Sequence, residues 1–250
     1  MDLLLNRLQN EIQARGLLYP LDVLLVGATG SGKSSTINAL NKGRMLAKVG
    51  YGVAPETQII SEYRLHEYLR IHDSAGLGDG KEADLRHACD ITQTLTKLCT
   101  INNQASHSYA LIDMALVILD GGLRDLGTAF QLLQTVVLKD IEPERVVVVI
   151  NQADQAMKGR HWNYALNYPD AILANFLEEK AISVQRRIKE STGLSISKPI
   201  CYSAEYGYNV DAVLAHLINH LPQSRRSIKK TVTICTESRD VNFTQGIPWW

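Results

Sequence analysis

Eight consecutive residues have the types and spacing of a phosphate-binding loop of the form G-x-x-x-x-G-K-S. They are Gly27, Ala28, Thr29, Gly30, Ser31, Gly32, Lys33 and Ser34, with Ser35 directly after them. The glycines let backbone N–H groups converge on a phosphate, and a helix that follows adds the positive end of its dipole. The lysine can neutralise β- and γ-phosphates, and the serine hydroxyl can ligate Mg²⁺. The loop predicts binding of a nucleoside triphosphate with Mg as cofactor.

The segments around this loop are the ones that must position it. Strand-like and helix-like segments alternate along the chain, and the four valines at 146–149 indicate a strand buried on both faces. We therefore predict an α/β fold: a doubly wound, mostly parallel six-stranded sheet with helices on both faces. Strands are expected at 21–26, 58–63, 68–73, 112–119, 145–150 and 199–202, and helices at 1–15, 32–41, 84–101, 126–137, 171–189 and 209–221.

The composition of the chain indicates the kind of protein to expect and how its domains are arranged along the sequence. The chain has 250 residues, no net charge and four cysteines that are far apart, without a C-x-x-C pair. No secretory signal or membrane-spanning stretch is visible, so we expect a cytoplasmic protein. We predict an amphipathic helix at 1–18, the nucleotide-binding domain at 19–222 and a basic and aromatic tail at 223–250. Basic residues at 186–189 and 225–230 leave RNA, ribosome or membrane contact open beside the alternative of a solvated surface.

Three further motifs follow predicted strands in chain order. Asp73 can hold a Mg²⁺-bound water, and the N–H group of Gly76, in the same D-x-x-G motif, can contact a γ-phosphate. The third motif contains Asn151, Gln152 and Asp154, and this last carboxylate can accept from both N1–H and the exocyclic amine of guanine. The fourth motif is Ser203, Ala204 and Glu205, whose backbone N–H groups could bind the guanine oxygen. The carboxyl ends of parallel strands meet at one edge, so all the motifs should form one site.

With these four motifs, residues 21–221 resemble a GTP-binding domain of the translation-factor-related class, close to its Era-like and septin-like branches. The segments 30–35, 37–40 and 150–154 are similar to an Era-related group of bacterial GTP-binding proteins. The resemblance implies GTP binding and hydrolysis, with loops that order around the γ-phosphate. It also implies a switch threonine that ligates Mg²⁺, and Thr57 is the one threonine between Ile37 and Asp73.

The sequence departs from that pattern at several positions. Leu77 stands where Ras-like members carry a water-orienting glutamine, and leucine forms no side-chain hydrogen bond. Asp79 is a candidate to position the water instead. Gly30 stands where potassium-dependent members have asparagine, and Gln152 replaces the usual lysine. Hydrolysis must therefore use another group, be slow, or be completed by a partner.

Two functions remain open from the sequence. The first is a Mg²⁺-dependent GTPase that switches between GTP and GDP forms, with Lys33, Thr57, Gly76 and Asp79 as candidate catalytic residues. The second is a GTP-dependent interaction or assembly module with little intrinsic hydrolysis. Septin-like relatives meet across the nucleotide face, which predicts a GTP-dependent homodimer.

Overall fold

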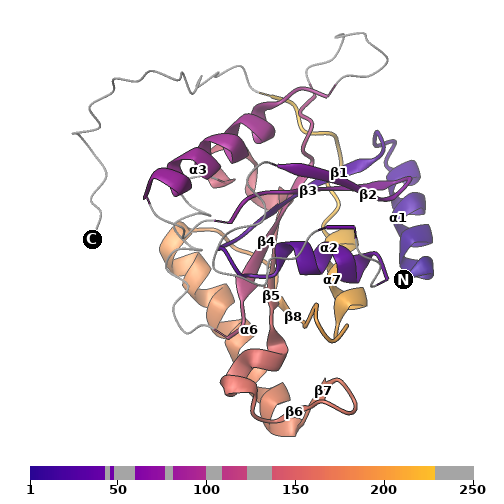
Figure 1. Cartoon of the computed structure of the whole chain (residues 1–250). Coiled ribbons are helices and arrows are strands. Elements are labelled where there is room, and N and C mark those ends of the chain that lie inside the picture. The colour runs from indigo at the N-terminus through magenta and orange to yellow at the C-terminus, as the bar shows by residue number, and fades with distance from the viewer. Residues whose placement is uncertain (43–45, 48–59, 77–80, 100–108, 123–136, 229–250) are drawn as a thin grey trace.

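The structure, a computed structural model, describes residues 1–42, 46–47, 60–76, 81–99, 109–122 and 137–228. The strands of its main sheet are β1 (Leu21–Val26), β2 (Ser61–His66), β3 (Leu69–Asp73), β4 (Met114–Asp120), β5 (Val146–Asn151) and β8 (Ile200–Cys201). They lie in the order β2-β3-β1-β4-β5-β8, in which only β2 and β3 are antiparallel (Figure 1). The predicted six-stranded, mostly parallel sheet is confirmed.

Helices cover both faces of this sheet, as predicted. The α-helices among the described residues are α1 (Asp2–Ala14), α2 (Lys33–Leu40), α3 (Lys81–Thr96), α5 (Leu138–Asp140), α6 (Ala171–Thr192) and α7 (Val210–Asn219), and two 3-10 helices cover Pro143–Arg145 and Ala153–Gly159. One buried cluster joins α3 and α6 to the sheet, through residues such as Ile91 and Leu177. The other joins α1, α2 and α7 to the opposite face, through Leu8, Ile37 and Val213 (Figure 1). No helix among the described residues is long and apolar enough to cross a membrane.

Local chemistry explains where the longest helix begins and ends. The side chain of Asp170 accepts hydrogen bonds from the backbone N–H groups of Ile172 and Leu173, as an N-cap does. Gly193 ends the helix with φ of 74°, a left-handed conformation that favours glycine. Helix α6 therefore extends to Thr192, three residues beyond the predicted end.

Other predicted boundaries need correction. Helix α3 ends at Thr96 and not at 101, because Leu98 pairs with Ala110 and the N–H group of Cys99 donates to the Tyr109 carbonyl. Strand β2 begins at Ser61, and the first two residues of the predicted strand, 58 and 59, lie outside the described residues. Most of the helix predicted at 126–137 lies outside the described residues. A short hairpin, β6 (Trp162–Asn163) and β7 (Tyr168–Pro169), was not predicted because its strands have two residues each.

The two edges of the parallel strands carry different chemistry. The four motifs follow the carboxyl ends of β1, β3, β5 and β8. Residues 222–228, which follow α7 in the chain, pack at the opposite edge, where these strands begin. There the N–H group of Ala110 donates to the Arg226 carbonyl, and Ser227 pairs with Tyr109. Among the basic residues considered for RNA or lipid contact, Arg226 is buried in this arrangement and the side chain of Arg225 is 6% exposed.

Candidate functional site

Residues 27–32 of the phosphate loop connect β1 to α2, and Lys33, Ser34 and Ser35 lie in the first turn of that helix. Gly32 has φ of 86°, and a Cβ atom there would lie 2.1 Å from the side-chain nitrogen of Asn151. A residue with a side chain would therefore be strained and would displace Asn151. This glycine lets the loop turn while the third motif approaches it.

Lys33 lies in the first turn of α2, with its side chain folded over the loop. Its Nζ donates to the carbonyl oxygens of Gly27 at 3.2 Å and Ala28 at 3.1 Å, and the residue is only 7% exposed. The ammonium group is thus held within the loop on acceptors weaker than a phosphate oxygen. A triphosphate in the loop would give this charge a stronger, charge-assisted partner.

Ser34 and Asp73 meet beside the loop. The Ser34 hydroxyl donates to Oδ2 of Asp73 at 2.8 Å, whereas Oδ1 is buried and has no hydrogen-bond partner among the described residues. Burial raises the pKa of Asp73, against the hydrogen bond from Ser34 and the nearby charge of Lys33. A hydroxyl and a carboxylate with an unsatisfied oxygen are the donors that Mg²⁺ prefers, so these residues fit that ion.

The backbone of Gly76 lies directly against the phosphate loop. A Cβ atom at Gly76 would be 2.5 Å from the backbone nitrogen of Thr29, so only glycine fits at this distance. The hydroxyl of Ser74 donates to the Leu25 carbonyl at 2.6 Å and fixes the loop after β3 to β1. The second motif is therefore in contact with the first, as a γ-phosphate contact requires.

Asn151 joins the phosphate loop to the fourth motif. Its side-chain nitrogen donates to the Ser31 carbonyl at 3.0 Å, and its side-chain oxygen accepts from the N–H group of Ala204 at 3.0 Å. Asn151 is buried at the end of β5. One amide thus fixes two loops that are far apart in sequence.

Gln152 and Asp154 lie on the loop after β5. The Gln152 side chain donates to the Gly30 carbonyl at 2.6 Å, so this residue also contacts the phosphate loop despite replacing lysine. Asp154 is 3% exposed and accepts from the Gln155 side chain at 2.8 Å through Oδ2. A carboxylate has about four lone-pair positions, so this bond leaves acceptor capacity for a base.

The fourth motif forms a tight turn after β8. The N–H group of Ser203 donates to the Tyr208 carbonyl at 3.0 Å, and its hydroxyl accepts from the N–H group of Tyr206 at 3.3 Å. The Glu205 side chain is exposed. Because Asn151 accepts from the Ala204 N–H group, the structure gives this group a role in holding the loop.

Three residues that bear on catalysis lie outside the described residues. They are the proposed Mg²⁺ ligand Thr57, Leu77 and the candidate water-positioning residue Asp79.

Some contacts at the site had no motif to indicate them. The hydroxyl of the fully buried Tyr202 lies 2.7 Å from that of Thr36, which in turn donates to the Gly32 carbonyl at 2.7 Å. Burial raises the pKa of Tyr202, so this phenol stays protonated. Tyr202, which follows β8, thus contacts the first half of α2 through Thr36. In the sequence, only its position next to the fourth motif indicated that it could lie at the site.

Aromatic residues gather beside the loop that carries Asp154. Tyr206 lies 5.6 Å from Trp162 and 5.8 Å from Tyr164, measured between ring centroids. A Cβ atom at Gly159 would lie 3.2 Å from the Tyr164 hydroxyl. Nothing in the sequence indicated this cluster, because its residues come from two separate segments, the β6–β7 hairpin and the turn after β8, and have no regular spacing.

The mostly parallel sheet, the phosphate loop after β1 and the ordered motifs at the same edge define a P-loop GTPase domain. Residues 22–152 match the family model described as 50S ribosome-binding GTPase, which is just over half of the chain, and the protein belongs to this family. A comparison with curated proteins found no match.

Solved structures share the fold at low sequence identity. Toc33 from Arabidopsis thaliana, in complex with GDP and Mg²⁺, is 14% identical with a TM-score of 0.59; the alignment covers 90% of this chain and 93% of Toc33. Era in complex with MgGDPNP and 16S ribosomal RNA is 16% identical with a TM-score of 0.53, over 84% of this chain and 60% of Era. Aquifex aeolicus Era bound to GDP and AlF4⁻ is 18% identical with a TM-score of 0.50, over 80% and 56%. This chain therefore spans less than two thirds of the Era chains.

Proposed function

We propose that the protein is a Mg²⁺-dependent GTPase that hydrolyses GTP to GDP and phosphate and acts as a nucleotide switch. The observation that carries this proposal is the double contact of Asn151, which donates to Ser31 and accepts from Ala204. It holds a phosphate-binding loop and a base-binding loop at one edge of the sheet, next to the buried carboxylate of Asp154. Membership of a GTPase family supports the same conclusion.

Each residue of the site has a defined task in this proposal. The Lys33 ammonium group leaves the carbonyls of Gly27 and Ala28 for the β- and γ-phosphates and neutralises charge that develops on them. The N–H groups of the phosphate loop do the same from fixed positions, which requires no reorganisation during the reaction. Gly76, held against Thr29, brings its N–H group towards the γ-phosphate.

The metal site is proposed at Ser34 and Asp73. Ser34 would ligate Mg²⁺ directly, Asp73 would hold it through a water, and Thr57 would complete the set when GTP is bound. Mg²⁺ held there would supply positive charge that stabilises the negative charge of the phosphate groups. The positive charge of this ion would also lower the pKa of Asp73 and so oppose the effect of burial, which raises it. Toc33 and Era were both solved with Mg²⁺ and a guanine nucleotide, which is consistent with this site.

A GTP-dependent assembly module is the second candidate, and Leu77 is the observation that favours it. This residue removes the usual water-orienting amide, and Gly30 removes the potassium ligand. In a homodimer formed across the nucleotide face, as in the septin-like branch, the second subunit would supply the missing group. A dimerization-deficient mutant of Toc33 has been solved, so dimerization occurs in a protein of this fold.

Single-turnover hydrolysis measured against protein concentration separates the two functions. If a homodimer completes the site, we expect the specific rate to rise with protein concentration and to be the same in sodium and potassium salts. A monomeric GTPase would turn over at a rate independent of concentration. Binding of a non-hydrolysable GTP analogue to a monomer that hydrolyses GTP at full rate would contradict the homodimer.

Replacing Thr57 with alanine should slow hydrolysis about 10-fold or more and leave GDP affinity unchanged. The reason is that a switch threonine engages Mg²⁺ only when the γ-phosphate is present. Fluorescent GDP titration and single-turnover hydrolysis measure the two quantities, and Thr36→Ser, which keeps a hydroxyl in α2, is the control. An equal loss of GDP affinity in Thr57→Ala would show that this residue is not the switch ligand.

A further inference from the structure

Helix α3 is attached to the second motif through a residue in its first half. Nδ1 of His87 lies 2.8 Å from the Gly76 carbonyl oxygen, and His87 is 8% exposed. A carbonyl oxygen only accepts hydrogen bonds, so Nδ1 is the donor in this contact. Glycine rotates more freely than any other residue, and this bond restricts the orientation of its carbonyl. His87 therefore fixes the residue whose N–H group is proposed to contact the γ-phosphate.

The other end of α3 is attached to the segment after α7. Arg226 is 3% exposed and donates to three carbonyl groups, with Nε at 2.9 Å from the Ile112 oxygen and the two terminal nitrogens on Leu95 and Asp140. Leu95 lies in the last turn of α3, where carbonyl groups have no partner within the helix. A buried guanidinium group at this point satisfies such a carbonyl and complements the helix dipole.

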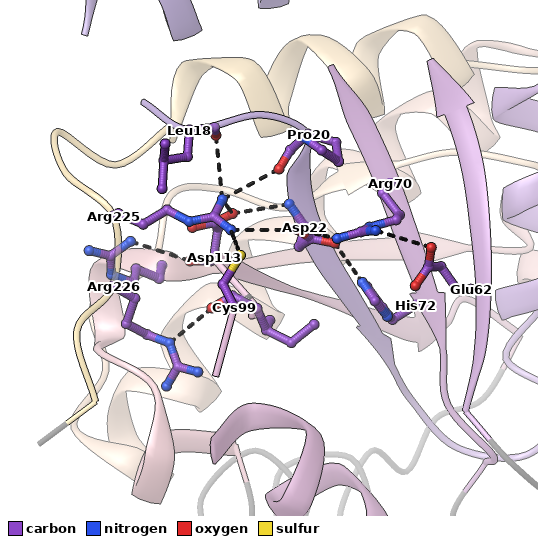
Figure 2. A network of polar contacts seen from close by, with 12 residues as sticks. Leu18, Pro20, Asp22, Glu62, Arg70, His72, Cys99, Asp113, Arg225 and Arg226 are labelled. Atoms are coloured by element: carbon purple, nitrogen blue, oxygen red, sulfur yellow. Dashed lines mark hydrogen bonds and ion pairs between the residues drawn. The ribbon is translucent and has the colours of Figure 1, made fainter. Parts of the chain in front are cut away.

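Residues 222–228 are in turn fixed to the edge where the parallel strands begin. Arg225 forms an ion pair with Asp113 and donates to the carbonyls of Leu18 and Pro20, each at 3.4 Å (Figure 2). Arg145 donates to the Ser224 carbonyl at 2.9 Å. These contacts hold the segment that carries Arg226 against this edge of the sheet.

Two buried acidic residues at this edge of the sheet stabilise the attachment of residues 222–228. Asp22 and Asp113 are each 1% exposed, and Asp22 also accepts from Arg70 and His72 (Figure 2). Burial opposes the charge of Asp22, but the hydrogen bonds from His72 and Arg70 prevail and lower its pKa. Burial raises the pKa of Asp113 to about 7, against the charge of Arg225. The charge of Arg225 thus favours the ionised form of Asp113, and the ion pair between them holds the segment to this edge.

We propose that His87 is a positioning residue for the γ-phosphate contact of Gly76, and that α3 links it to Arg226 of the segment 222–228, which follows α7. The span from His87 to Leu95 is eight residues of helix, about 12 Å, and a packed helix moves as a unit over such a length. A nucleotide that holds Gly76 in place therefore favours the position of α3 in which Arg226 contacts Leu95. Coupling is reciprocal, so loss of either attachment must change the preference between GTP and GDP. This inference rests on the proposed function.

The test is a double-mutant cycle on nucleotide preference. His87→Phe keeps a ring but removes the donor, and Arg226→Met keeps an extended side chain but removes the guanidinium group. Affinities for a non-hydrolysable GTP analogue and for GDP are measured by fluorescence titration in wild type, both single variants and the double variant. Each single variant should lower the ratio of analogue affinity to GDP affinity about 5-fold or more, a typical coupling between sites. In the double variant, the affinity ratio should be less than twofold below that of either single variant, because both changes act through α3.

Arg15→Met is the matched control. Arg15 also donates to carbonyls at the start of the segment, those of Leu221 and Pro222. It stands at the end of α1, and its other side-chain bond is to Glu11, so none of these bonds is to α3. The affinity ratio should be unchanged in this variant. Hydrogen exchange in the wild type gives a second measurement: the amide of Ala110, which donates to the Arg226 carbonyl, should exchange more slowly with the GTP analogue than with GDP.

The outcomes separate this inference from the proposed function. A wild type that binds neither nucleotide would refute the proposed function. A wild type that binds both, with unchanged ratios in His87→Phe and Arg226→Met, would refute only the coupling. Independent effects that multiply in the double variant would likewise refute a shared path through α3. If Arg226→Met does not fold, equal exchange of the Ala110 amide in the two nucleotide states would still overturn the proposal.

Discussion

Replacing Asp154 with asparagine is expected to lower GTP affinity by about 10⁴-fold and to create affinity for xanthosine triphosphate. The wild-type carboxylate can accept from N1–H and the exocyclic amine of guanine, whereas an amide presents a donor towards that amine. Xanthine carries a carbonyl oxygen in place of the amine, so the new amide can donate to it. The bond from Gln155 to Oδ2 can be kept by the oxygen of the new amide, which leaves its NH₂ group for the base.

Competition titrations with GTP, ATP and xanthosine triphosphate measure this change of base. Asp120→Asn is the matched control, because Asp120 ends the neighbouring strand β4 and accepts from the Gly122 N–H group through Oδ1. An amide oxygen can accept the same bond, so GTP affinity should stay close to that of the wild type. Comparable affinities of the wild type for ATP and GTP would remove the basis of the guanine assignment.

The fold and the arrangement of the site could be predicted from sequence because their signals are local. A phosphate loop needs glycines and a lysine at fixed spacing, and β5 shows its burial on both faces as consecutive valines. Strand-end motifs then meet because parallel strands end at the same edge. That Asn151 contacts both Ser31 and Ala204, which lie far apart in the chain, was not predicted, since the sequence suggested the guanine oxygen as the partner of the Ala204 N–H group.

What could not be predicted depends on pairs that leave no pattern. Arg225 and Arg226 look like the start of a solvated basic tail, yet one forms an ion pair with Asp113 and the other binds backbone carbonyls. A carbonyl is present in every residue, so no residue type marks it as the partner of a buried arginine. His87 is likewise one of seven histidines, and only its distance from Gly76 distinguishes it. The early end of α3 has the same origin, since the pairing with residues 109 and 110 replaces its last turn.

Replacing Lys33 with alanine is expected to lower GTP affinity by roughly 10² to 10⁴-fold, the equivalent of the 3–5 kcal/mol lost when one partner of a buried charge pair is removed. The triphosphate would lose its nearest cation in a loop that holds this side chain 7% exposed. GDP affinity should fall less, because the γ-phosphate contributes nothing to it. Titration with fluorescent GTP and GDP analogues measures both losses.

Lys33→Met distinguishes lost charge from lost packing. Methionine keeps most of the apolar stem but has no ammonium group, so both variants should lose GTP affinity to the same extent if the charge is what binds. In both variants, the carbonyls of Gly27 and Ala28 also lose their hydrogen-bond donor. This loss should lower the free energy of unfolding of the nucleotide-free protein, which urea unfolding measures. GTP stabilises the wild type in proportion to its affinity, so this added stability should disappear in both variants. Retention of GTP affinity by Lys33→Met, with loss in Lys33→Ala, would show that the loop needs the stem and not the charge, and Lys33 would then not be the phosphate-binding lysine.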